Sequence, residues 1–339
     1  MNLIAVGNQN IILNGNPTKT FFKTTYAKYT NFGMEKHRID FNGNLNISGS
    51  LGIKGIDGNI IIGSGSGGNI TQGSYSGTIT PGSNLIIGNS SAEGLTTATQ
   101  NVVIGHDANS SQNGHFNVVV GNQAGNTVNG NDVVAIGYSA GSTGDANQMT
   151  VVGSGAGSAA TGDGTTALGQ NAVRQATGED NIGIGRSAGG NITSGGGNIV
   201  IGRSALQTGT NSSSGNIVMG YYSGQDLTGA DNVIIGAHDI NNDMNASERN
   251  VILGTLAGNV LNGGSSNILI GYHAGKVSTG NANIIIGSGS VGIAGESNQL
   301  RIGHTGSMTL LSGSFTTGDI IFANTASAPK LPDVSLFIS

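Results

Sequence analysis

Few residues of this chain have the type and spacing that chemistry requires. The six histidines are scattered, and none is paired at the i, i+4 spacing of a helical zinc site. The chain has no cysteine, which excludes a thiol nucleophile and a thiolate metal site. Two adjacent carboxylates, Glu179 and Asp180, could in principle cleave a glycosidic bond. We expect no enzyme activity, no catalytic residue, no metal and no cofactor, with carbohydrate cleavage as the alternative.

A second set of candidates follows directly after a recurring glycine. These residues are His106, Tyr138, Arg186, Arg203, Tyr221, Tyr272 and His304. If that glycine marks the same corner in every repeat, their side chains line one edge of the molecule and could contact a glycan or a protein. The simpler interpretation is that they form the solvated corner of each repeat.

The recurring glycine closes a cassette, such as Asn101–Gly105, that returns about every sixteen residues. It occurs at Gly63, Gly88, Gly105, Gly121, Gly137, Gly153, Gly169, Gly185, Gly202, Gly220, Gly236, Gly254, Gly271, Gly287 and Gly303. Helical-hairpin repeats need about thirty residues or more, so this period predicts coils of short strands and tight turns. We expect an all-β fold, a parallel β-solenoid (β-roll) of about fifteen coils.

Two cassette positions have expected structural roles. The closing glycine should allow a backbone conformation or a close approach that a Cβ atom would prevent. The asparagine four residues earlier occurs in eleven of the fifteen cassettes and should stack in a hydrogen-bonded ladder between coils.

The strand between these two residues is apolar on both faces. Alternation sends Val102 and Ile104 to one face and Val103 to the other, and we expect the flanking pair to fill the core. The apolar middle residues then need a partner chain, which we expect to be two further copies in a homotrimer. The alternative is that the N- or C-terminal segment covers them within one chain. The expected trimer interface comprises Ile61, Ile86, Val103, Val119, Val151, Val200, Val218, Ile234, Ile252, Leu269 and Ile285.

Composition divides the chain into three parts. Residues 1–48 form an aromatic, basic module, 49–303 the repeat body, and 304–339 a C-terminal cap or tail. The first fifty residues carry five basic and two acidic side chains, a net +3, and the remainder eight and sixteen, a net −8. An acidic body argues against a nucleic-acid partner. No apolar run approaches the roughly 18 residues of a membrane span, so membrane insertion is not expected. Arg301 replaces the apolar middle residue of the last cassette, where we expect the seam between chains to end.

The cassettes at about residues 59–303 resemble the head repeats of trimeric autotransporter adhesins, and are similar to repeats of phage and virus fibre proteins. This resemblance implies a β-roll in a trimeric fibre. The coil is longer than the adhesin coil, so turn details are not transferred. The neck, stalk and membrane anchor of the adhesins are missing from this sequence.

The N-terminal segment carries a second resemblance. Its Gly15-Asn16-Pro17 and Phe21-Phe22-Lys23 stretches, followed by Thr30-Asn31-Phe32, resemble the opening segment of capsid proteins of nucleocytoplasmic large DNA viruses. The resemblance implies association with a virion and with its capsid proteins, although the jelly roll of those proteins is replaced here by repeats. A simpler interpretation is that the segment caps the rod. The expected capsid-anchoring residues are Asn16, Pro17, Phe21, Phe22, Lys23, Tyr26, Thr30, Asn31 and Phe32.

Together these observations predict a virion structural protein, anchored to the capsid and located at its surface. The expected form is a homotrimeric spike or fibre that attaches to a host-surface glycan or protein. Two alternatives remain: an internal minor capsid protein that braces the capsid, and a carbohydrate-degrading spike.

Overall fold

The computed structural model describes residues 60–63, 83–95, 98–109, 114–126, 130–143, 145–207, 212–236, 246–259, 261, 263–276, 280–289, 295–304 and 308–322. The chain divides into two compact units, Met1–Gly52 and Ile53–Ser339, and all described residues belong to the second. The boundaries expected at residues 48 and 303 stay predictions.

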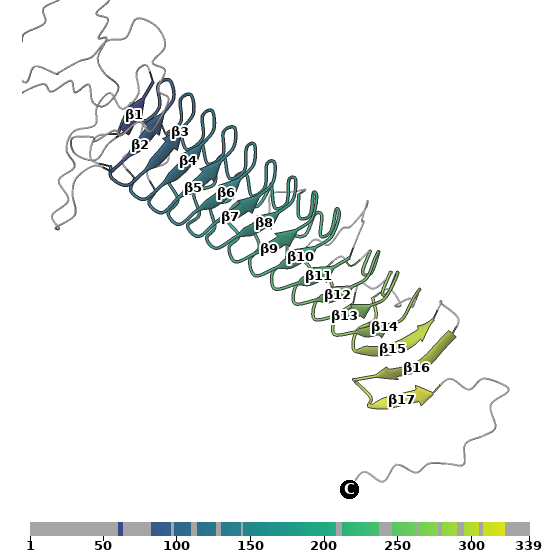
Figure 1. Cartoon of the computed structure of the whole chain (residues 1–339). Helices are drawn as coiled ribbons and strands as arrows, with labels where there is room; N and C mark the ends of the chain where they lie inside the picture. Colours follow the sequence, from purple (N-terminus) through teal and green to yellow (C-terminus); the bar gives the residue numbers. More distant parts are fainter. Residues whose placement is uncertain are drawn as a thin grey trace, which may run out of the picture. The chain divides into compact units, whose positions relative to one another are not determined.

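The second unit is a parallel β-solenoid (Figure 1). Each of the first fourteen cassettes forms one three-residue strand, and each of these strands pairs in parallel and in register with the next one in the sequence. The all-β solenoid expected from the repeat is therefore confirmed. The strands are β1 (Ile60–Ile62), β2 (Leu85–Ile87), β3 (Val102–Ile104), β4 (Val118–Val120), β5 (Val134–Ile136), β6 (Thr150–Val152), β7 (Thr166–Leu168), β8 (Ile182–Ile184), β9 (Ile199–Ile201), β10 (Ile217–Met219), β11 (Val233–Ile235), β12 (Val251–Leu253), β13 (Ile268–Ile270) and β14 (Ile284–Ile286).

The closing glycines turn the chain after each strand, and the role expected for them is confirmed. Gly137 has φ +135°, and a Cβ atom on it would lie 2.6 Å from the carbonyl oxygen of Gly153 in the next coil. A second corner follows four residues later, where Gly141 has φ +55°. Both conformations lie in the region that glycine adopts without steric cost.

The inside and outside of the strands are the reverse of our expectation. The middle residue of each strand faces the core, as Val103 and Val119 show with 0% and 1% exposure. The flanking residues face outward, and Ile136 and Ile184 are 38% and 37% exposed. The asparagine explains the reversal: Asn101 is buried, and alternation from an inward Asn101 places Val103 inward as well.

The predicted trimer interface is wrong for the same reason. Most of its residues are at most 5% exposed within a single chain and form the solenoid core, so they are not available to another chain. Ile61, in the first described strand, is the exception at 42% exposure. The buried ones are Ile86, Val103, Val119, Val151, Val200, Val218, Ile234, Ile252, Leu269 and Ile285. We call the surface formed by the first and third residues of β1–β14 the outer face.

The C-terminal end departs from the repeat. β15 (Gln299–His304) continues the parallel sheet, while β16 (Met308–Ser314) and β17 (Asp319–Phe322) add to it in antiparallel fashion. Arg301 aligns with Ile285, so it lies in the column of core residues and not on a seam between chains. Its guanidinium pairs with Glu296 at 3.2 Å, which neutralises the charge where the apolar core ends. The hairpin covers the last parallel strand, as a solenoid end requires.

Candidate interaction surfaces

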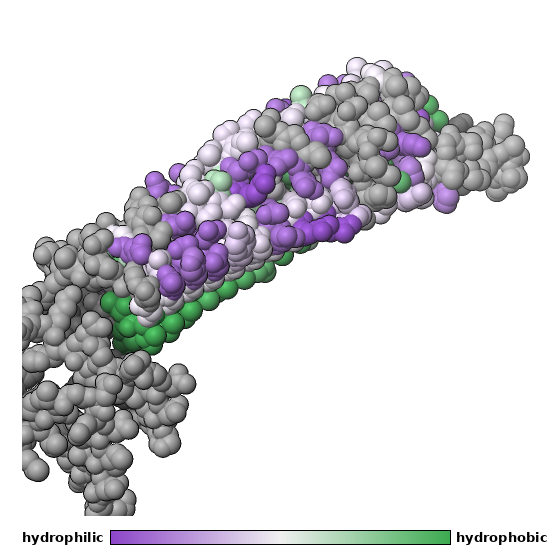
Figure 2. Space-filling view, turned by 90° about the horizontal axis from the view of Figure 1, so that it is seen from above, coloured by the Kyte–Doolittle hydropathy of each residue, from purple (hydrophilic) through white to green (hydrophobic). Residues whose placement is uncertain are grey.

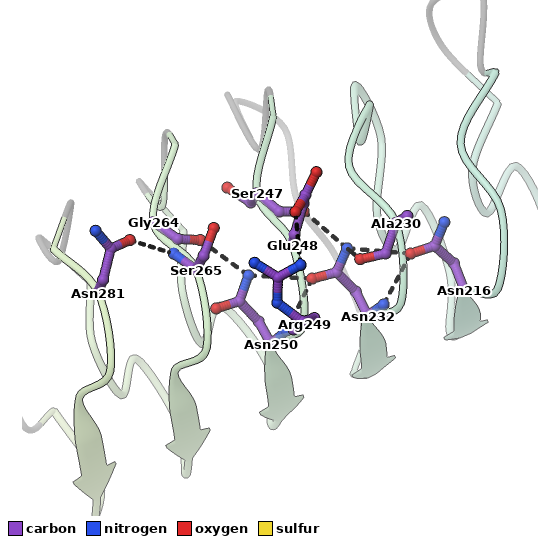
Figure 3. A network of polar contacts seen from close by, with 10 residues as sticks. All are labelled: Asn216, Ala230, Asn232, Ser247, Glu248, Arg249, Asn250, Gly264, Ser265 and Asn281. Atoms are coloured by element: carbon purple, nitrogen blue, oxygen red, sulfur yellow. Dashed lines mark hydrogen bonds and ion pairs between the residues drawn. The ribbon is translucent and has the colours of Figure 1, made fainter.

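The asparagine ladder keeps successive coils in register (Figure 3). Nδ2 of Asn232 donates to Oδ1 of Asn216 at 3.1 Å and to the carbonyl of Ser247 at 2.8 Å. Asn250 repeats the pattern toward Asn232 and the carbonyl of Gly264. The predicted ladder is confirmed. Because the coils stay in register, residues at equivalent positions stack along the outside of the solenoid.

The residues after the closing glycines therefore form a column along one edge, which we call the corner column. Tyr138, Tyr221 and Tyr272 in this column are exposed. His106 pairs with the neighbouring Asp107, with Nδ1 and Oδ2 3.0 Å apart. Other coils place small or uncharged residues here, such as Ser154. The chemistry of the column therefore changes from coil to coil, as a surface that is mostly solvated would allow.

Arg203 and Tyr221 of the corner column form a compact cationic and aromatic cluster with Tyr222, the residue that follows Tyr221. The guanidinium carbon of Arg203 lies 4.3 Å from the ring centroid of Tyr221, and its Nη2 donates to the Tyr221 hydroxyl. Tyr222 packs edge-on against Tyr221 with centroids 4.4 Å apart. Arg186 occupies the same position one coil earlier. Our sequence reasoning omitted Tyr222, although a pair of tyrosines after a closing glycine was visible.

The two carboxylates proposed for glycoside cleavage lie on a turn. Glu179 and Asp180 are both exposed, and Asp180 has φ +57° immediately before the buried Asn181. Within the described ranges, no three His, Cys, Asp or Glu side chains are grouped so that they could hold a metal ion. The carboxylates remain two solvated side chains on one corner, and carbohydrate cleavage stays an untested alternative.

The expected anchoring residues, from Asn16 to Phe32, lie outside the described residues. Comparisons with known proteins show what this part of the chain is similar to. In its N-terminal region the chain is 54% identical over 43 residues to the major capsid protein of Chrysochromulina ericina virus, which is 13% of this chain and 7% of that protein. The major capsid protein of Pyramimonas orientalis virus is also 54% identical over 43 residues, 11% of its length. That of Paramecium bursaria Chlorella virus 1 is 49% identical over 43 residues, 10% of its length.

This N-terminal region is similar to viral capsid proteins. The resemblance predicted from the Gly-Asn-Pro and Phe-Phe-Lys stretches is thus confirmed, while the chain spans only about a tenth of these relatives. No family model matches the chain, and no solved structure matches it. The described residues include no helix that is long and apolar enough to cross a membrane.

Proposed function

We propose that this chain is a structural protein of a virus particle. The observation that carries the proposal is the similarity of its N-terminal region to major capsid proteins of three viruses. A protein that docks on or among capsomers would need a segment that is shared with capsid proteins. In this chain that segment is attached to a body that is not a capsid jelly roll. The segment supplies the attachment, and the solenoid supplies a stiff extension.

The solenoid is suited to a spike or fibre that is not an enzyme. Parallel pairing runs without a break from β1 to β15, and at about 4.8 Å per coil this gives a length of roughly 70 Å. Because each coil contacts only its neighbours, length is gained without a large core. We propose that three copies form the fibre and that it projects from the capsid surface.

Host attachment is the proposed role of the corner column. Side chains at one position in successive coils present repeated contacts, and several weak contacts made together raise the overall affinity. The cluster of Arg203, Tyr221 and Tyr222 is the strongest candidate contact, because stacked cations and aromatic rings bind anionic sugars and proteins alike.

The attachment role of the N-terminal segment is tested by double substitution in the full chain. Phe21→Ala with Phe22→Ala should prevent the protein from co-sedimenting with virus particles, whereas Arg203→Ala should leave co-sedimentation unchanged. Normal incorporation of the double variant would contradict the proposed anchoring.

Particles carrying Arg203→Ala and Tyr221→Ala should bind host cells less well than particles carrying the matched Gln170→Ala. Protection of the solenoid from protease in intact particles would favour an internal brace over a surface spike.

A further inference from the structure

The outer face is an apolar surface without a partner in the single chain. Of its 28 positions, two in each of fourteen strands, only Thr150 and Thr166 are not apolar, leaving 26 apolar positions. None of the 28 is charged. Figure 2 shows the result as a continuous hydrophobic stripe along one side of the solenoid, next to a hydrophilic surface. A sheet face in contact with water usually carries polar side chains, whereas the outer face is almost entirely apolar.

The outer face is large for an apolar surface on a single chain. Fourteen strands at about 4.8 Å and two columns about 7 Å apart give a stripe on the order of 470 Å², before the outer flanks of the side chains are added. This area lies in the upper half of the range of about 300–600 Å² found for the largest apolar patches on monomers. A stable complex of ordinary size buries about 800 Å² on each partner.

We propose that the outer face packs against the outer faces of other copies of this chain, parallel and in register. A second copy offers a surface with the same length, coil spacing and lack of charge, and sheets pack face to face at about 10 Å. The proposal rests on the proposed function for the number of copies and for the choice of the parallel arrangement. In the proposed interface the contacts between copies are made by the first and third residues of each strand. The middle residues, which the sequence had suggested, lie in the core.

The two threonines occupy the first positions of β6 and β7. Two faces that pack in parallel are related by a rotation about the solenoid axis, which reverses the strand direction. The first position of each strand therefore lies opposite the third position of the same strand in the other copy, so Thr150 faces Val152 and Thr166 faces Leu168. In an antiparallel arrangement with full overlap, β6 lies opposite β9 and β7 opposite β8, so each hydroxyl faces isoleucine positions. Neither arrangement pairs the hydroxyls, and the threonines do not distinguish between them.

One antiparallel register would place the threonines of the two copies opposite each other, but it covers less of the face. Placing β6 opposite β7 leaves β13 and β14 without an opposing strand. The parallel register covers all fourteen strands. It also places β1 of every copy at the same end of the assembly, as a common attachment to one surface would require.

The absence of cysteine from the natural chain makes the arrangement directly testable by single-cysteine cross-linking. Three variants of the full chain are purified without capsid: Val120→Cys in β4, Leu253→Cys in β12 and, as control, Gln170→Cys in the corner column. With a short thiol-specific cross-linker at low protein concentration, the first two variants should each form covalent dimers on a denaturing gel. The control should remain a single chain.

Each other outcome would overturn the proposal. Cross-links that form only in a mixture of cysteine variants from opposite ends of the outer face would mean antiparallel packing. A single-chain mass by light scattering would mean that a segment of the same chain covers the stripe. Because no capsid is present, these results are independent of whether the N-terminal segment anchors the protein to a particle.

Discussion

Oδ1 of Asn232 accepts two hydrogen bonds from Asn250 in the next coil, one from the backbone amide and one from Nδ2, each at 3.0 Å. Asn250 is completely buried, so its amide has no access to water. One side-chain oxygen therefore satisfies two buried donors of the following coil, which is why the asparagine returns with the strand. Where the ladder is interrupted, Val133, Met149 and Thr165 replace it in consecutive coils. Consecutive replacement removes donors and acceptors together, which costs less than removing one partner alone.

Replacing Asn232 by alanine should lower the free energy of unfolding by about 2–4 kcal/mol, because it leaves Asn250 donors and the Ser247 carbonyl unpaired. The matched control is Asn281→Ala. Asn281 accepts a hydrogen bond from the amide of Ser265 at 2.7 Å, but this contact is exposed, and water can replace it (Figure 3). We expect a loss of less than about 1 kcal/mol for the control. Denaturant unfolding followed by circular dichroism measures both, and equal losses would contradict a special role for the buried ladder.

Two glycine-to-alanine substitutions compare a glycine at a closing corner with one in an open turn. Gly137 and Gly197 both have positive φ, but an added Cβ would meet the Gly153 carbonyl oxygen in the first case and nothing within 4 Å in the second. Gly197→Ala should cost only the left-handed backbone penalty, about 1 kcal/mol. Gly137→Ala should cost at least about 3 kcal/mol, because φ +135° is strained for alanine and neighbouring coils must also move apart. Thermal melts would show the difference, and similar melting temperatures would contradict the close approach.

Adjacent residues of β11 test which side of the strand faces the core. Ile234 is 5% exposed and Ile235 is 41% exposed. Ile234→Asp places a charge without a partner in the core and should cost at least about 3 kcal/mol, with loss of β structure by circular dichroism. Ile235→Asp should keep the β structure and lower the mass measured by light scattering, since like charges then meet at the outer face. If Ile234→Asp folded normally, the inward placement of the middle residues would be wrong.

A single substitution is expected to increase stability. Asn109 is buried, has φ +45°, and neither of its side-chain polar atoms has a hydrogen-bond partner. The equivalent position in the next coil is Gly125, with φ +55°. Asn109→Gly should raise the free energy of unfolding by about 1 kcal/mol, because it removes a buried unsatisfied amide and relieves the backbone. A lower melting temperature than that of the natural chain would show that the amide has a stabilising partner.

Spacing and residue type were sufficient to predict the repeat architecture and the two features that define each coil. A period of about sixteen residues can hold only short strands and turns, and the closing glycine and asparagine have no equally good substitutes for their turns and ladder. The N-terminal similarity to capsid proteins could also be predicted from the sequence, from the order of residues such as Pro17 and Phe22. These features depend on local or regularly repeated contacts.

The orientation of the strands required the folded chain. When all three strand residues are apolar, as in Val102-Val103-Ile104, alternation gives two faces but does not say which one is inside. Burial of Asn101 resolves it, because a polar side chain enters the core only where stacked coils supply its hydrogen bonds. The sequence places Arg203 and Tyr221 on one edge, and Arg301 five residues after Glu296, but the contacts within these two pairs are seen only in the folded chain. Such contacts arise from the stacking of coils and the ends of the stack, which exist only in three dimensions.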